Sequence, residues 1–213
     1  MLTDDQLGKI ETVVEAFRLD HGIPEDTRPD MMDLLIRMRI KGTLVAVDVS
    51  DEPTGYAGEY DPSRNTITIR KAVADRQSPR DRFTIAHEIG HKLGDHSSTR
   101  YRRADGAKQF GRQKEQDEEE ANAFAAALLI PEKLADVDPS TTATQLADRF
   151  AVSLRVAEIR LKFLQRRYRH KHGVRREVPV TAKAVSSPDD MFDSGDYDAA
   201  MSQMLRNARR WNE

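Results

Sequence analysis

The segment from residue 78 to residue 96, SPRDRFTIAHEIGHKLGDH, constrains the fold of this chain more than any other. Ser78 is a helix-capping residue, Pro79 suits the first helical position, and Asp81 stands where the acid of a capping box belongs. Gly94 is a suitable residue for the opposite end of the same helix. The segment therefore predicts one well-defined helix that carries two histidines and a glutamate.

The two histidines are predicted to lie on a buried face of this helix. His87 and His91 are four residues apart, so both imidazoles point to the same side. That side also carries small and apolar residues, which are Phe83, Ala86, Gly90 and Gly94. Two buried histidines and a buried glutamate cost free energy unless they have partners. A bound metal ion would be such a partner.

The pattern His-Glu-x-x-His suits a hydrolytic metal centre. Zinc accepts neutral imidazole, and a catalytic zinc site has three protein ligands and an open position for water. Glu88 is rotated by about 100° from His87 around the helix, so its carboxylate lies beside the metal and can take a proton from water. The prediction is therefore that His87 and His91 are ligands and that Glu88 is the general base.

Composition limits the other possibilities. The chain has no cysteine, which excludes disulfides and zinc–thiolate sites and favours a cytoplasmic location. Of its 213 residues, 33% are charged, and there is no apolar run of about 18 residues, so we expect no membrane segment. The acidic N-terminus is not followed by an apolar stretch, and we expect no signal peptide.

Spacing leaves the third ligand open. His96 is one residue short of the position that a metzincin histidine occupies, which is Ser97 here. We therefore interpret His96 as a partly exposed histidine beyond the end of the helix. The alternative is a carboxylate from a later helix, as in thermolysin-type sites.

A later segment, KEQDEEEANAFAAALLIP, predicts that second helix and ends at Pro131. Its apolar stripe consists of Ala121, Phe124, Ala125, Leu128 and Leu129. Glu118 and Asp117 border the stripe on opposite sides, whereas the other acids lie farther from it. Both are candidates for the third ligand, and Asn122 could hydrogen-bond a ligand from behind.

The remaining pattern predicts an α+β fold. Helices are expected at about residues 3–17 and 29–40, and strands at about 43–49, 55–60 and 66–70. Two short helices are expected on either side of residues 151–153. Beyond Gly173 the composition favours a linker, with a last helix at about residues 197–211.

The two motif helices together resemble the ImmA/IrrE family of metallopeptidases. FTIAHEIGH and EEEANAFAAALLIP both match the family pattern without a gap, and the likeness covers residues 31–164. The resemblance implies that Glu118, which stands three residues before Ala121, is the third ligand rather than Asp117. It also implies one Zn²⁺ per chain.

The resemblance has implications for architecture as well. It implies a small zincin-like peptidase domain, with a twisted sheet packed on the histidine helix, at residues 1–135. A helical unit similar to a helix-turn-helix would follow at residues 136–172, and a partly disordered tail at residues 173–213.

Characterised members of this family cleave Xre-type helix-turn-helix repressors and thereby relieve repression in stress responses, mobile elements or prophages. We therefore expect a zinc-dependent endopeptidase that cleaves such a repressor. One alternative is the toxin component of a toxin–antitoxin-like pair with an Xre-type antitoxin. Another is a DNA-binding regulator with an inactive peptidase fold, although Glu88 and every ligand are retained.

The sequence does not determine two parts of the substrate site. A second donor for the oxyanion is usual, and the candidates are Tyr60, Tyr101 and His96. A sheet edge formed by TITIR, residues 66–70, could pair with an extended substrate.

A basic run extends from Arg155 to Arg176, with nine Lys/Arg and one acid, Glu158. Contact with DNA phosphates is one interpretation. The other is a helix end whose cations serve solubility and complement the helix dipole.

Overall fold

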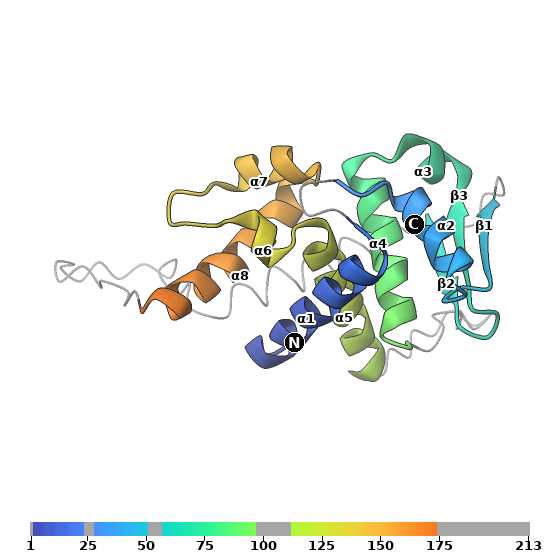
Figure 1. The fold of residues 1–213 in the computed structure, drawn as a ribbon, viewed down its shortest axis with the longest axis horizontal. Helices are drawn as coiled ribbons and strands as arrows, with labels where there is room; N and C mark the ends of the chain where they lie inside the picture. Colours follow the sequence, from blue (N-terminus) through green and yellow to red (C-terminus); the bar gives the residue numbers. More distant parts are fainter. Residues whose placement is uncertain (1, 24–27, 51–56, 97–111, 174–213) are drawn as a thin grey trace.

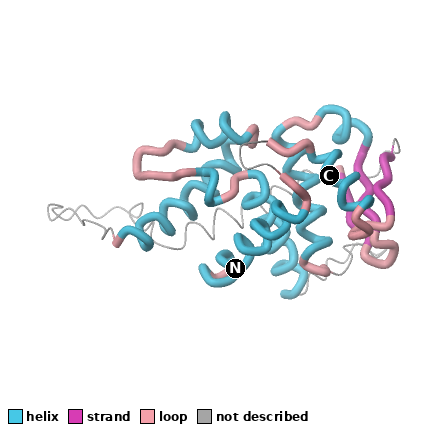
Figure 2. The backbone as a smooth tube through the Cα atoms, in the orientation of Figure 1, coloured by secondary structure: helices cyan, strands magenta, loops and turns pink. Residues whose placement is uncertain are grey.

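The computed structural model describes residues 2–23, 28–50, 57–96 and 112–173. A small sheet lies at one end, α4 (Pro79–Leu93) and α5 (Arg112–Leu129) cross the middle, and α6 (Glu132–Ala135), α7 (Ala143–Phe150) and α8 (Leu154–His172) lie at the other end (Figure 1). Strands are confined to the first end (Figure 2). The α+β prediction is confirmed. Among the described residues, no helix has the length and apolarity that a bilayer crossing requires.

The sheet has three strands, β1 (Ala46–Ser50), β2 (Gly58–Asp61) and β3 (Thr66–Arg70), in the order β1-β3-β2. β1 pairs with β3 in parallel and β2 pairs with β3 in antiparallel fashion. The prediction that TITIR offers a free edge to a substrate is therefore wrong. The alternation of its side chains indicates which residues are buried, and Ile67 and Ile69 are buried. It does not indicate whether the strand is central or at an edge of the sheet.

The N-terminal helices are α1 (Asp4–Asp20), which packs on α5, and α2 (Met31–Ile40), which packs on α4 and β1. Thr3 caps α1 in a capping box, and the Asp30 carboxylate caps α2 by accepting two backbone N–H groups. The buried face of α2 is the predicted one, which consists of Met31, Leu34, Leu35 and Met38.

A short helix that the sequence analysis missed, α3 (Lys71–Arg76), connects the sheet to α4. The Arg76 guanidinium donates to both oxygens of Asp81 at 2.6 and 2.7 Å. Ser78 and Asp81 form the predicted capping box, with Pro79 in the first turn. α3 therefore fixes the start of the histidine helix and, through it, the direction in which His87 and His91 point.

α7 and α8 pack on each other and are joined at residues 151–153, as predicted. α8 has 19 residues, however, and is not short. A buried arginine of α4, Arg82, connects this unit to the rest of the molecule. Its Nη1 donates to the carbonyls of Phe150 and Ala151, both at 3.1 Å. The similarity to a helix-turn-helix and the boundary at residue 136 stay predictions.

Candidate metal centre

A close approach between α4 and α5 brings the predicted ligands together. A Cβ atom at Gly90 would lie 2.9 Å from both Cα and the carbonyl oxygen of Ala121, so only glycine permits this contact. His87 and His91 stand on either side of Gly90 along α4, and Glu118 stands one turn before Ala121 on α5. The glycine therefore sets the distance between the two halves of the site.

The three predicted ligands converge. Nε2 of His87 and Nε2 of His91 are 2.9 Å apart, and the carboxylate oxygens of Glu118 lie 3.5 and 3.6 Å from them. Each of the three residues offers one atom within 4.8 Å of the others. Asp117, which spacing had left open, is not part of this group within the described residues.

These distances fit a zinc ion. Tetrahedral ligands at about 2.0–2.1 Å from zinc are roughly 3.3 Å from one another, and the three observed distances fall on either side of that value. Two imidazoles and one carboxylate are also a donor set that catalytic zinc sites use.

His87 is supported from behind by Asn122. The Asn122 side chain is fully buried, and its Oδ1 lies 3.1 Å from Nδ1 of His87. Burial alone would lower the pKa of His87, but the hydrogen bond and charge of Glu118, together with the charge of Glu88, raise that pKa. The site therefore favours a positive charge at this position, whether a proton or a cation.

The predicted base, Glu88, is buried between α4 and β2. The backbone N–H of Tyr60 donates to its Oε2 at 2.9 Å, and burial raises its pKa to about 7. β2 approaches so closely that a Cβ atom at Gly58 would lie 3.1 Å from Cγ of Glu88. A carboxyl group with a pKa near 7 can both accept and release a proton at neutral pH.

The three candidates for an oxyanion donor are placed differently. The Tyr60 hydroxyl lies 3.5 Å from Oδ1 of Asn65 in the β2–β3 turn, so its backbone rather than its hydroxyl reaches Glu88. Tyr101 lies outside the described residues. His96 was expected to be partly exposed, and this is wrong: the residue is only 5% exposed.

His96 is buried because the end of α4 folds it back. Its Nδ1 lies 3.0 Å from Nδ1 of His91, and its ring therefore touches a predicted ligand without joining the ligand group. The spacing of residues in the sequence does not predict the contact between His96 and His91, because that contact depends on how α4 ends. The backbone role of Tyr60 and the close approach at Gly90 were also missed, although the small residue at position 90 was a signal for the latter.

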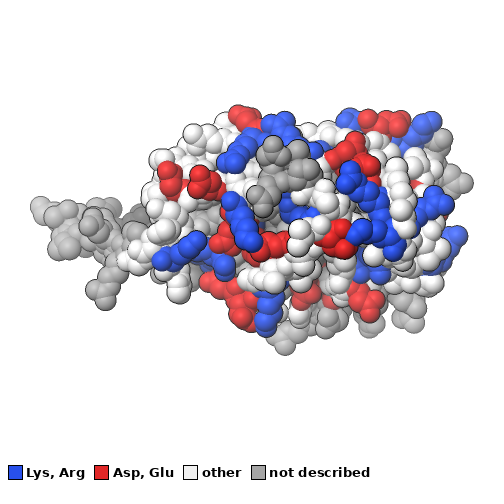
Figure 3. Space-filling model, in the orientation of Figure 1, with Lys and Arg blue, Asp and Glu red and all other residues white. Residues whose placement is uncertain are grey.

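Several cations of the basic run on α8 are paired within the molecule. Arg160 is buried and donates to both carboxylate oxygens of Glu11, and Arg167 lies 2.8 Å from Glu132. Basic and acidic side chains are interspersed over the face shown in Figure 3. These contacts favour the interpretation of a packed helix end, and DNA contact stays a prediction.

One comparison with known proteins identifies a family. No curated protein matches the chain. The Peptidase_M78 family, described as the IrrE N-terminal-like domain, matches residues 46–162, a stretch that holds the sheet and both motif helices. This chain therefore belongs to the IrrE N-terminal-like family of metallopeptidases.

Proposed function

We propose that this protein is a zinc-dependent endopeptidase that cleaves a regulatory protein, an Xre-type helix-turn-helix repressor. The observation that carries the enzymatic part is the convergence of His87, His91 and Glu118, with the charge of Glu88 close enough to act on His87. The repressor as substrate rests on the resemblance to the ImmA/IrrE family alone.

The residues have separate tasks in this proposal. Zinc, when bound, would supply a Lewis acid that polarises the scissile carbonyl and activates water. His87, His91 and Glu118 would hold the ion, and Asn122 would orient His87.

Glu88 would carry the proton. Its Oε2 accepts the Tyr60 N–H, and in this proposal Oε1 takes the proton from the attacking water. The same oxygen then gives the proton to the leaving amine, which restores the carboxylate. The buried setting that raises the pKa of Glu88 supports both directions of this transfer.

The first experiment measures metal content. The full chain is purified without chelator, supplied with zinc and analysed beside Glu118→Ala and Glu88→Gln. We expect one zinc per wild-type chain, a content below about a tenth of that in Glu118→Ala, and full content in Glu88→Gln. A wild-type chain that takes up no zinc would exclude the proposed enzyme.

The second experiment tests the substrate. Zinc-loaded protein is incubated with purified Xre-type repressors encoded beside its gene, and the products are mapped by mass spectrometry. Cleavage by the wild type and none by Glu88→Gln supports the proposal. Intact repressors, together with a loaded and folded enzyme, would contradict the repressor as substrate and leave the toxin alternative in place.

A further inference from the structure

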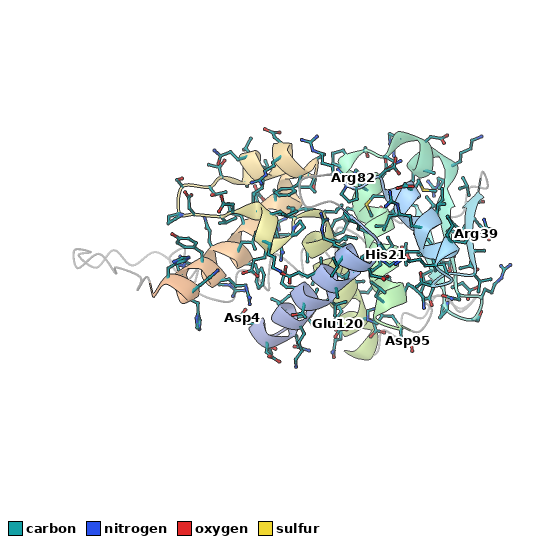
Figure 4. The ribbon with its side chains drawn as sticks, viewed as in Figure 1. Asp4, His21, Arg39, Arg82, Asp95 and Glu120 are labelled. Carbon is teal, nitrogen blue, oxygen red and sulfur yellow. The ribbon has the colours of Figure 1, made fainter. Side chains whose placement is uncertain are left out.

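A chain of polar contacts runs from His91 away from the metal ligands. Nδ1 of His91 lies 3.0 Å from Nδ1 of His96, and Nε2 of His96 lies 3.3 Å from Oε2 of Glu120. Gln116 donates to the other oxygen of Glu120 at 2.8 Å. The His96 side chain is 5% exposed and the Glu120 side chain is 33% exposed, so the chain leads from the buried ligand toward the surface of α5. Figure 4 labels Glu120 of α5 and Asp95, which follows the end of α4.

The way α4 ends brings His96 to His91. Asp95 has a φ of 50°, in the left-handed region, and its N–H donates to the carbonyl of Lys92. The N–H of His96 donates to the carbonyl of His91 at 3.1 Å. Together these are the two hydrogen bonds of a Schellman motif, which turns the chain back over the last helical turn.

Gly94 leaves the room that the His96 ring fills. A Cβ atom at this position would lie 2.2 Å from Nε2 of His96 and 2.5 Å from Cε1. The backbone of Gly94 has a φ of −77°, which any residue adopts. The glycine is therefore required by the histidine ring and not by the backbone.

Metal binding by His91 would determine which ring nitrogen of each histidine carries the proton. If Nε2 of His91 faces a metal, its lone pair is used there and its proton is on Nδ1. That proton is donated to Nδ1 of His96, so the proton of the His96 ring is on Nε2. The Nε2–H of His96 then points to the Glu120 carboxylate, which accepts it.

We propose that His96 and Glu120 are positioning residues that orient His91 and fix its tautomer for metal binding. The inference rests on the proposed metal site. His87 has a neutral amide, Asn122, behind it, whereas His91 has a carboxylate that acts through a second histidine. A hydrogen-bonded carboxylate makes an imidazole a better ligand, and loss of such a partner commonly weakens metal binding by about 10- to 100-fold.

The test compares zinc affinities by competition with a chromogenic chelator. His96→Leu removes both ring nitrogens, His96→Gln keeps one donor and one acceptor, and Gly94→Ala leaves both histidines in the sequence but takes the space of the ring. We expect about 10- to 100-fold weaker binding in His96→Leu and Gly94→Ala, and a smaller loss in His96→Gln.

The matched control is Gly8→Ala, a glycine-to-alanine change away from the metal site. The nearest atom to a Cβ at Gly8 is Nη1 of Arg167 at 3.5 Å, an ordinary contact, and the position is on α1. We expect wild-type zinc affinity there. The thermal stability of each metal-free variant is measured as well, so that unfolding is not mistaken for loss of the ion.

Nitrogen NMR of the histidine rings adds a readout that a purely structural role would not move. In the zinc-loaded wild type we expect the proton of His91 on Nδ1 and that of His96 on Nε2. A proton on Nδ1 of His96, or wild-type zinc affinity in folded His96→Leu, would overturn the inference while leaving the metal site intact. A wild type without zinc would instead overturn the proposed function and the inference with it.

Discussion

The acidic run of α5 and the basic run of α8 differ in what their side chains contact in this protein. The acidic run of α5, residues 115–120, directs Glu118 to His87 and His91 and Glu120 to His96. The basic run of α8 directs Arg160 into the core, where it is paired with Glu11. One run builds a site, and the other holds helices together.

The difference lies in what each run faces. Two acids of α5, Glu118 and Glu120, face histidines, so their charge meets groups that can bind a cation or a proton. The arginines of α8 face carbonyl oxygens and carboxylates of the same molecule, as when Nε of Arg160 donates to the carbonyl of Ile130 at 2.9 Å. A run of charge therefore becomes informative only when its partners are known.

The strongest test of the structural role of α8 is Arg160→Ala. The substitution leaves the Glu11 carboxylate buried without its partner and also removes the donor to Ile130. Breaking one side of a buried pair costs about 3–5 kcal/mol, and we expect a loss of that size in the free energy of unfolding. Urea denaturation measures it.

The matched control for this test is Lys162→Ala, an exposed cation two residues farther along α8. We expect little change there. A loss below about 1 kcal/mol in Arg160→Ala would contradict the structural role and return the basic run to the candidates for binding.

The second test, Gly90→Ala, concerns the site that the acidic run of α5 forms with α4. Alanine normally favours a helix over glycine, but here its Cβ would meet the Ala121 backbone and push α4 from α5. We expect a destabilisation of about 1–3 kcal/mol and a lower zinc content, because Glu118 moves away from the histidines. Denaturation and metal analysis of the same preparation check both. Unchanged zinc content would show that the close approach does not set the ligand distances.

The sequence predicted the parts of the site that follow from helical periodicity. His87 and His91 share a face because they are four residues apart, and Glu88 follows from the same geometry. The choice between Glu118 and Asp117 did not follow from periodicity, since both border the apolar stripe. It needed the family resemblance, and the structure then placed Glu118 with the histidines.

The parts that could not be predicted depend on contacts between elements distant in sequence. The burial of His96 depends on a left-handed residue, Asp95, at the end of α4. The central position of β3 depends on which strands pair with it, which its own side-chain pattern does not encode. Arg160 belongs to a basic run in the sequence, yet its partner Glu11 is on α1.

A third prediction concerns acid stability at the start of α4. Burial would raise the pKa of Asp81, but hydrogen bonds from Arg76 and Ser78 outweigh it and lower the pKa. A carboxyl group whose pKa is lower in the folded state contributes stability above its unfolded pKa, near 3.9, and loses it as pH falls through the folded pKa. We expect Asp81→Asn to cost about 1 kcal/mol at pH 6 and less at pH 3.

Denaturation of both proteins at the two pH values measures this effect. The comparison with the variant isolates Asp81, because other aspartates with lowered pKa values, such as Asp30, are present in both chains. An equal difference at pH 6 and pH 3 would show that the charge of Asp81 does not stabilise the start of the histidine helix.

The smallest expected effect is that of the exposed cations of α8. Lys162 and Lys171 are both exposed, so Lys162→Gln with Lys171→Gln should change the free energy of unfolding by less than about 0.5 kcal/mol. The double variant also tests DNA contact, since each lost phosphate contact lowers the salt slope of DNA binding by about 1. Because the contacts of Arg160 and Arg167 favour a packed helix end over a DNA-binding surface, we expect no change in that slope, measured by fluorescence anisotropy with a short duplex. A slope reduced by about 2 would mean that the basic run serves DNA after all, and that α8 combines packing with binding.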